Sequence, residues 1–320
     1  MRTTQRQFSS ITRLTALEAS RQPIFLLLTT VVILFIGLLP LLITHVIGDA
    51  DRVIRDSALA VQLVSGLVLG CYAATATITR ELHKGTLASI LSKPVGRTLF
   101  FLAKFAGVAL IMVIFAATTT LATMLSVRTV AEPYVYDWWG IGPLFVSVLL
   151  AYAWAGLQNF FMRTPFVSRT YLLVTIAVAA AFLVSCLVPA EGSSEGFASA
   201  LPWNIVPAGL LIGLAMVLLS AFAVTLAIRM DLVPTLTLCF TIFLLGLMSD
   251  YLFGRQADVH WFFALLHGIV PNWQHFWAVD ALKGNGIPWS YTANVAVYVA
   301  LYSAVVLSGG LYLFKRMEVK

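Results

Sequence analysis

Apolar residues in this chain gather into long runs that short polar stretches separate. Each run is about 20 residues or longer, the length that an α-helix needs to cross a bilayer. We expect a membrane span in each of about eight runs: 24–47, 57–78, 99–127, 140–162, 171–189, 205–228, 232–253 and 290–314.

These runs predict helices because lipid offers no partner to backbone N–H and C=O groups, which a helix satisfies within itself. The short alternating strands of a transmembrane barrel are not seen in the sequence. We therefore predict an all-α, polytopic helical bundle that forms one membrane domain over residues 1–320.

Composition and charge fit this prediction. The chain is 60% hydrophobic and only 11% charged, which lies outside the range of soluble globular proteins. With both termini in the cytoplasm, 15 of the 20 lysines and arginines fall on the cytoplasmic side, as the positive-inside rule requires. The net charge of +6 thus reports topology and gives no reason to expect a nucleic-acid partner.

Residues 79–98, TRELHKGTLASILSKPVGRT, are the longest strongly polar island between two apolar runs. Leu82, Leu87 and Leu91 give the island part of an apolar helical face, and Pro94 ends that pattern. Physical reasoning alone leaves two interpretations, a helix lying on lipid headgroups or a surface for another protein.

The residues in and after this island resemble the cytoplasmic loop behind the second span of type 2 permeases of ATP-binding cassette (ABC) exporters. The resemblance rests on Glu81, Lys84-Gly85-Thr86-Leu87, Ile90-Leu91-Ser92-Lys93-Pro94-Val95, Arg97, Lys104-Phe105 and Gly107. It implies that residues 79–98 form a coupling loop that docks on a separate ATPase. The residues implied to contact that ATPase are Glu81, Lys84, Gly85, Thr86, Leu91, Ser92, Lys93, Pro94 and Arg97.

Other segments resemble the same family. Residues 1–23, with apolar positions from Phe8 to Leu17 at intervals of three, are similar to its amphipathic N-terminal helix. Residues 255–289, rich in tryptophan, are expected to be interfacial or re-entrant on the other side of the membrane. The common family core has six spans, so runs 140–162 and 171–189 are the expected additions.

The chain has no G-x-x-x-x-G-K-[ST] motif, so it cannot hold nucleotide phosphates in a P-loop. We therefore expect no cofactor on this chain, with ATP and Mg on a P-loop ATPase partner. Because two ATPase subunits would need two membrane halves, we expect either a homodimer or a pair of this chain with a related permease. We expect the location to be the plasma membrane, which in bacteria is the inner membrane.

The predicted function is thus that of the membrane permease subunit of an ABC exporter, without enzyme activity of its own. A membrane assembly protein without transport stays an alternative. An ion-coupled carrier is disfavoured because no ionisable group lies near a span centre; we expect Lys104, six residues into its run, to snorkel to the surface.

Three smaller sets of residues complete the expectations. Two glycine pairs, Gly66 with Gly70 and Gly209 with Gly213, predict close helix packing or a dimer seam. The cysteines have no spacing typical of a disulfide framework and suggest helix packing: Cys71, Cys186 and Cys239. The histidines of residues 255–289 lack an acid or cysteine at a metal-binding spacing, so no metal site is predicted.

Overall fold

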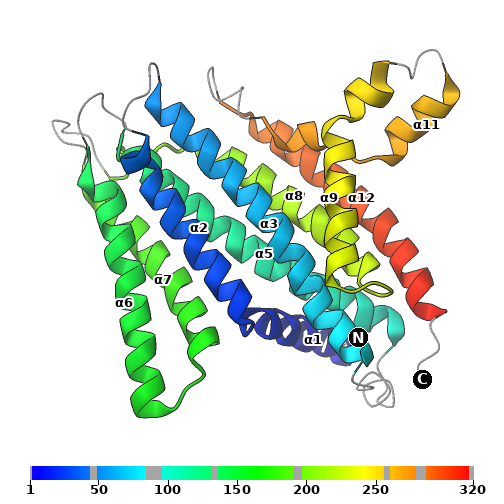
Figure 1. Cartoon of the computed structure of the whole chain (residues 1–320), viewed down its shortest axis with the longest axis horizontal. Coiled ribbons are helices and arrows are strands. Elements are labelled where there is room, and N and C mark those ends of the chain that lie inside the picture. The colour runs from blue at the N-terminus through cyan, green and yellow to red at the C-terminus, as the bar shows by residue number, and fades with distance from the viewer. Residues whose placement is uncertain are drawn as a thin grey trace. The chain divides into compact units, whose positions relative to one another are not determined.

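The computed structural model describes residues 2–43, 49–83, 96–130, 136–189, 197–255, 260–278 and 286–316. Within these ranges the chain forms helices and turns and no strand (Figure 1). The predicted all-α, polytopic helical bundle is confirmed.

Seven helices in the described part of the chain are long and apolar enough to cross a membrane. They are α2 (Pro23–Leu42), α3 (Ala50–His83), α5 (Arg97–Arg128), α6 (Trp138–Met162), α7 (Phe166–Leu187), α8 (Ile205–Leu226) and α12 (Trp289–Lys315). The remaining elements are α1 (Arg2–Ser20), α9 (Leu232–Leu247), the π-helix η1 (Asp250–Gly254), α11 (Trp261–Ile269) and the 3-10 helix η2 (Trp273–Phe276).

The eighth expected span, 232–253, is shorter than predicted. Helix α9 has 16 residues, or about 24 Å at 1.5 Å per residue, against about 30 Å of bilayer hydrocarbon. Beyond it the chain widens into η1, which begins at the polar residue Asp250. Gly246 lies near the end of α9. It is so close to the carbonyl of Pro271 and the indole of Trp273 that even a Cβ atom at this position would clash.

The chain divides into two compact units. Unit 1 comprises Met1–Ala19, Leu67–Val113 and Leu211–Lys320, and unit 2 comprises Ser20–Gly66 and Ile114–Leu210. Helices α3, α5 and α8 contribute residues to both units. Whether residues 1–320 act as a single permease domain stays a prediction.

In unit 2, α6 and α7 form a hairpin whose two helices lie side by side (Figure 1). Helix α6 ends at Arg163, which takes the left-handed conformation (φ 52°) typical of helix C-termini, and Pro165 precedes α7. Helix α2 packs on the hairpin through a hydrogen bond of 2.7 Å between the hydroxyls of Thr30 and Tyr152. Helices α6 and α7 correspond to runs 140–162 and 171–189, which the sequence suggested as additions to a six-span core.

In unit 1, α12 packs against both α5 and α8. The ring of Phe314 stacks on that of Phe101, with ring centroids 5.7 Å apart. Gly310 faces the side chain of Thr225 on α8, and the Thr225 hydroxyl reaches the Val306 carbonyl oxygen at 3.4 Å. This packing holds the start of α5, which directly follows the predicted coupling loop, against the end of α12.

Candidate functional site

Helix α1 crosses the first turns of α5 and is fixed there by an ion pair. Lys104 on α5 is only 2% exposed, and its Nζ lies 3.2 Å from Oε2 of Glu18 on α1. The Nζ atom also lies 5.7 Å from the centre of the Phe100 ring, a cation–π distance. The expectation that Lys104 snorkels to the surface is therefore wrong, because its ammonium finds a carboxylate within the protein.

The crossing is close because α5 carries a glycine at the contact. A Cβ atom on Gly107 would lie 2.7 Å from the carbonyl oxygen of Thr12, which is too near for any side chain. The hydroxyl of Thr12 also donates to the carbonyl of Ala103 at 3.3 Å. We call this contact, formed by Thr12, Thr15, Glu18, Lys104 and Gly107, the Lys104 joint.

The first residue of α5 is tied to the last residue of α12. Nη1 of Arg97 donates to the carbonyl oxygen of Lys315 at 3.0 Å. The carbonyls at a helix C-terminus lack partners in their own helix and attract cations, so an arginine is well suited to this place. Together with the Lys104 joint, this bond links the start of α5 to two other helices of unit 1.

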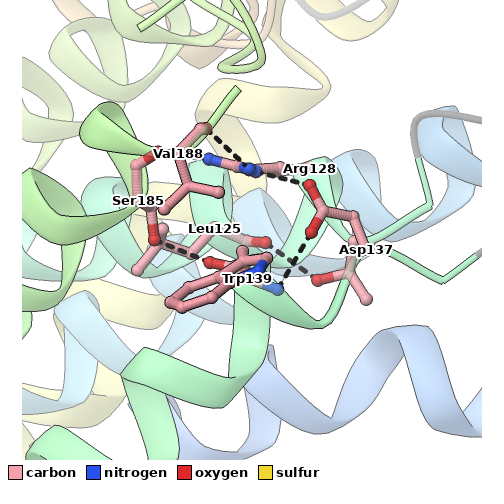
Figure 2. A network of polar contacts seen from close by, with 7 residues as sticks. Leu125, Arg128, Asp137, Trp139, Ser185 and Val188 are labelled. Carbon is pink, nitrogen blue, oxygen red and sulfur yellow. Dashed lines mark hydrogen bonds and ion pairs between the residues drawn. The ribbon is translucent and has the colours of Figure 1, made fainter. Parts of the chain in front are cut away.

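A second buried cation, Arg128, ends α5 and belongs to unit 2 (Figure 2). It is 1% exposed, and its Nε donates to Oδ2 of Asp137 at 2.8 Å. Nη2 donates to the carbonyl oxygen of Val188 at 3.0 Å, and Nη1 donates to that of Ser185. The planar guanidinium thus holds one carboxylate and two carbonyls from the end of α7.

The partners of Arg128 also bind one another. Asp137 is the N-cap of α6, since its Oδ1 accepts a 2.9 Å hydrogen bond from the backbone N–H of Trp139. The Ser185 hydroxyl donates to the carbonyl of Trp139 at 2.7 Å (Figure 2). We call this network, formed by Arg128, Asp137, Trp139, Ser185 and Val188, the Arg128 joint; it connects the ends of three helices.

The comparison with protein families matches about half of the chain. Residues 17–171 match the model described as "ABC-2 family transporter protein", which is just under half of the chain. Over this region the chain is similar to ABC-2 family transporter proteins. No curated protein and no solved structure matches the chain.

The match includes α2, α3, α5 and α6. Of the two joints it includes Glu18, Lys104, Gly107, Arg128, Asp137 and Trp139. An ABC-2 family assignment supports a membrane permease of ABC-type transport. With seven span-length helices in its described part, the chain is a multi-pass membrane protein.

Most of the predicted coupling loop, residues 79–98, falls outside the described residues. Arg97 is described and bonds to Lys315, as shown above. Only the place of Glu81 within α3 is described. The other predicted contact residues lie outside the described ranges: Lys84, Gly85, Thr86, Leu91, Ser92, Lys93 and Pro94.

The four glycines with a predicted packing role are all buried. Gly209 has less space around it than Gly70. A Cβ atom on Gly209 would lie 3.0 Å from Cβ of Thr120 and 2.4 Å from its Cγ2 and Oγ1 atoms. A Cβ on Gly70 would meet Ser220 only at 3.6 Å, an ordinary contact. Gly66 and Gly213 lie on α3 and α8. A role of these residues in a dimer stays a prediction.

A polar cluster joins η1 to α11, which lies in the tryptophan-rich segment 255–289. Oδ1 of Asp250 lies 2.9 Å from Nε2 of His267 and 2.9 Å from Nδ2 of Asn272. The hydrogen bonds from His267 and Asn272 hold the pKa of Asp250 below its usual range. The cluster thus ties α11 to η1 through the contact between Asp250 and His267.

Sequence reasoning missed both joints as structural units. No structural role was predicted for Arg128 or for Glu18. The signal that could have found Arg128 is a strong cation directly at the end of a long apolar run, followed by an acid at an N-cap position. No pattern in the sequence pairs Glu18 with Lys104, which lies on a different helix.

Proposed function

We propose that this chain is the membrane permease subunit of an ATP-driven exporter in a plasma membrane. A separate P-loop ATPase, which carries ATP and Mg, docks on residues 79–98. Two copies of the chain, or the chain and a related permease, form the membrane part. Nucleotide binding by the ATPase pushes on the loop and reorients the helices that follow it.

The observation that carries this proposal is the ABC-2 family match, because residues 17–171 include the whole predicted coupling loop. The surroundings of the loop support it further. Helix α3 leads into the loop and α5 leaves it, and both are continuous helices of more than 30 residues. A long helix transmits displacement along its axis because each turn is hydrogen-bonded to the next.

The contacts at the start of α5 suggest how a push would spread. Lys104 ties α5 to α1 through Glu18, and Arg97 ties α5 to the end of α12. A force on the loop therefore acts on α1, α5 and α12 together. Since α5 continues as one helix to Arg128, its displacement also reaches the Arg128 joint and the α6–α7 hairpin.

The test is charge reversal in the loop, with the chain and its candidate ATPase purified together. We expect Glu81→Lys and Lys93→Glu each to weaken association by about tenfold, which corresponds to roughly 1.4 kcal/mol. ATP hydrolysis stimulated by the membrane subunit should fall with it. Arg97 is less suitable for this test, because its substitution also breaks the bond to Lys315.

Arg229 offers a matched control. It is exposed between α8 and α9. The positive-inside rule, with both termini in the cytoplasm, places it on the same side of the membrane as the loop. Arg229→Glu should leave both association and hydrolysis unchanged. Unchanged assembly and hydrolysis in the two loop variants would overturn the proposal, and assembly without any transport in proteoliposomes would favour a role in membrane assembly.

A further inference from the structure

The α6–α7 hairpin of unit 2 carries an apolar groove along its length, with a volume of about 750 Å³. Small residues leave this space open, among them Gly142 on α6 and Ala180 on α7. A Cβ atom on Gly142 would meet nothing within 4 Å. Since the lining is almost wholly apolar and a membrane span is surrounded by hydrocarbon, an aliphatic chain is the kind of group that fits this groove.

The groove points toward the turn of the hairpin, at the end opposite the Arg128 joint. On α7 the lining residues share one helix face, because they recur every three or four positions: Leu173, Ala177, Ala180 and Val184. The exposed Arg169, four residues before Leu173, continues the same face. On α6, Phe161 follows the lining residue Trp154 by seven positions, or two turns, and is 74% exposed. The apolar groove therefore leads to a cation and an aromatic ring.

The length of α6 places the turn at a membrane surface. Its 25 residues extend about 37 Å at 1.5 Å per residue, which exceeds the hydrocarbon thickness of about 30 Å. Tryptophan favours the membrane–water interface, and Trp138 begins α6. The end of α6 and the start of α7 then lie among the headgroups of the opposite leaflet. With both termini in the cytoplasm, as predicted, this is the cytoplasmic leaflet.

The turn carries positive charge that no acid of the hairpin neutralises. Arg163, the C-cap of α6, and Arg169 are both exposed. Residues 138–190 contain no aspartate or glutamate. Asp137, the acid that precedes α6, lies at the other end of the hairpin and accepts from Arg128. The turn therefore attracts anions at the level of the lipid headgroups.

We propose that the α6–α7 hairpin binds an anionic phospholipid of the cytoplasmic leaflet. The headgroup phosphate pairs with Arg163 and Arg169, since guanidinium groups match phosphate oxygens in geometry as well as in charge. One acyl chain of the lipid lies in the groove, and Phe161 packs at the boundary between headgroups and acyl chains. The site goes beyond the proposed function and requires no ATPase.

Charge argues for a lipid over a helix of a second copy of this chain. On the predicted topology, 15 of the 20 lysines and arginines lie on the cytoplasmic side. A second copy would therefore bring mainly cations to the level of Arg163 and Arg169, where like charges repel. An anionic headgroup brings the opposite charge together with an apolar chain.

The headgroup contact can be tested on the full-length chain in neutral detergent by thermal unfolding. Phosphatidylglycerol, phosphatidylcholine with the same acyl chains, and glycerol 3-phosphate without chains are titrated separately. We expect only phosphatidylglycerol to raise the unfolding temperature. Arg169→Gln should raise the phosphatidylglycerol concentration for half of this effect about fivefold, and Arg163→Gln with Arg169→Gln about 25-fold. Arg229→Gln, which removes another exposed cation, should leave the concentration unchanged.

The groove has its own pair of variants. Ala180 is exposed, so Ala180→Phe fills the groove from its lipid side and should weaken phosphatidylglycerol binding at least threefold. Ala153→Phe adds the same ring at an exposed position of α6 outside the groove and should not weaken it. Native mass spectrometry, which counts the lipids that the protein retains, checks both.

Three results would overturn the proposal. Equal stabilisation by phosphatidylcholine would show that the arginines do not select the headgroup. Equal stabilisation by glycerol 3-phosphate would show that the groove holds no acyl chain. A protein dimer without retained lipid, which Ala180→Phe breaks and Ala153→Phe preserves, would assign the groove to a second copy of the chain.

Discussion

The two joints at the ends of α5 use the same parts in different ways. Each has a buried cation on α5 and a glycine at a close approach: Lys104 with Gly107, and Arg128 with Gly140 on α6. Lys104 has a carboxylate partner that is itself 36% exposed. Arg128 instead bonds to a carboxylate that is 19% exposed and to two backbone carbonyls.

The difference teaches what a charge buried in a membrane protein can hold together. An ammonium is a compact point charge, and Lys104 connects two helices through its ion pair with Glu18. A guanidinium presents five donors in a fixed plane, and Arg128 connects the ends of α5, α6 and α7 at once. The Arg128 joint is therefore the more specific and the harder to replace.

The largest effect is expected for Arg128. Arg128→Ala leaves Asp137 and two carbonyls of α7 without their donor, and we expect a loss of about 3–5 kcal/mol of unfolding free energy. Arg128→Lys should recover less than half of the lost unfolding free energy, because one ammonium cannot reproduce the planar set of donors of a guanidinium. Thermal unfolding of the purified chain in detergent measures both changes.

A control substitution separates the network from the charge alone. Arg13→Lys, at an exposed position of α1, should leave the unfolding temperature unchanged. Equal stability of Arg128→Lys and the wild type would show that only a positive charge is needed. In that case the contrast with Lys104 would disappear.

An intermediate effect is expected for the two glycines. A Cβ on Gly140 would lie 2.6 Å from the carbonyl oxygen of Leu125, and one on Gly107 would lie 2.7 Å from that of Thr12. Backbone cannot give way as a flexible side chain does, so each Gly→Ala change should cost about 1–3 kcal/mol. Gly142→Ala is the control, since nothing lies within 4 Å of its Cβ position.

Limited proteolysis of the two glycine variants tests whether the two joints are separate. Gly107→Ala should increase proteolysis of α1, because α1 rests on that position. Gly140→Ala should increase proteolysis near the start of α6 and leave α1 protected. The same cleavage pattern in both variants would contradict two separate joints.

The smallest effect is expected for Lys104. Lys104→Met keeps most of the volume and removes the charge, and the half-exposed Glu18 can then turn to water. We expect a loss of at most about 1 kcal/mol from the ion pair itself. Glu18→Gln, which leaves the buried ammonium with a weaker partner, should cost more than Lys104→Met. The reverse order, again from thermal unfolding, would mean that Glu18 is the more poorly solvated partner.

Several parts of the fold could be predicted from the sequence because they follow from local rules. Apolar runs gave the positions of seven spans, since a helix is the one spanning structure such runs can form. The eighth run misled because hydropathy continues past Leu247, while α9 ends where Gly246 packs on Pro271 and Trp273. The apolar run 232–253 is therefore longer than the helix α9 that it forms.

The candidate site was less accessible to sequence reasoning. The resemblance placed a coupling loop at residues 79–98, and the family match over residues 17–171 includes it. The partners of Lys104 and Arg128 were missed because they lie on other helices. Hydropathy treats a charge near the end of a run as a boundary marker and says nothing about what satisfies it.

The sequence by itself determined that this protein crosses a membrane many times as helices, because burying backbone in lipid leaves no other choice. It also fixed which residues are cations and where small residues allow close packing. Only the tertiary structure decided that Glu18 neutralises Lys104 and that Arg128 holds the end of α7. These contacts join residues distant in the chain, and their positions depend on how whole helices pack.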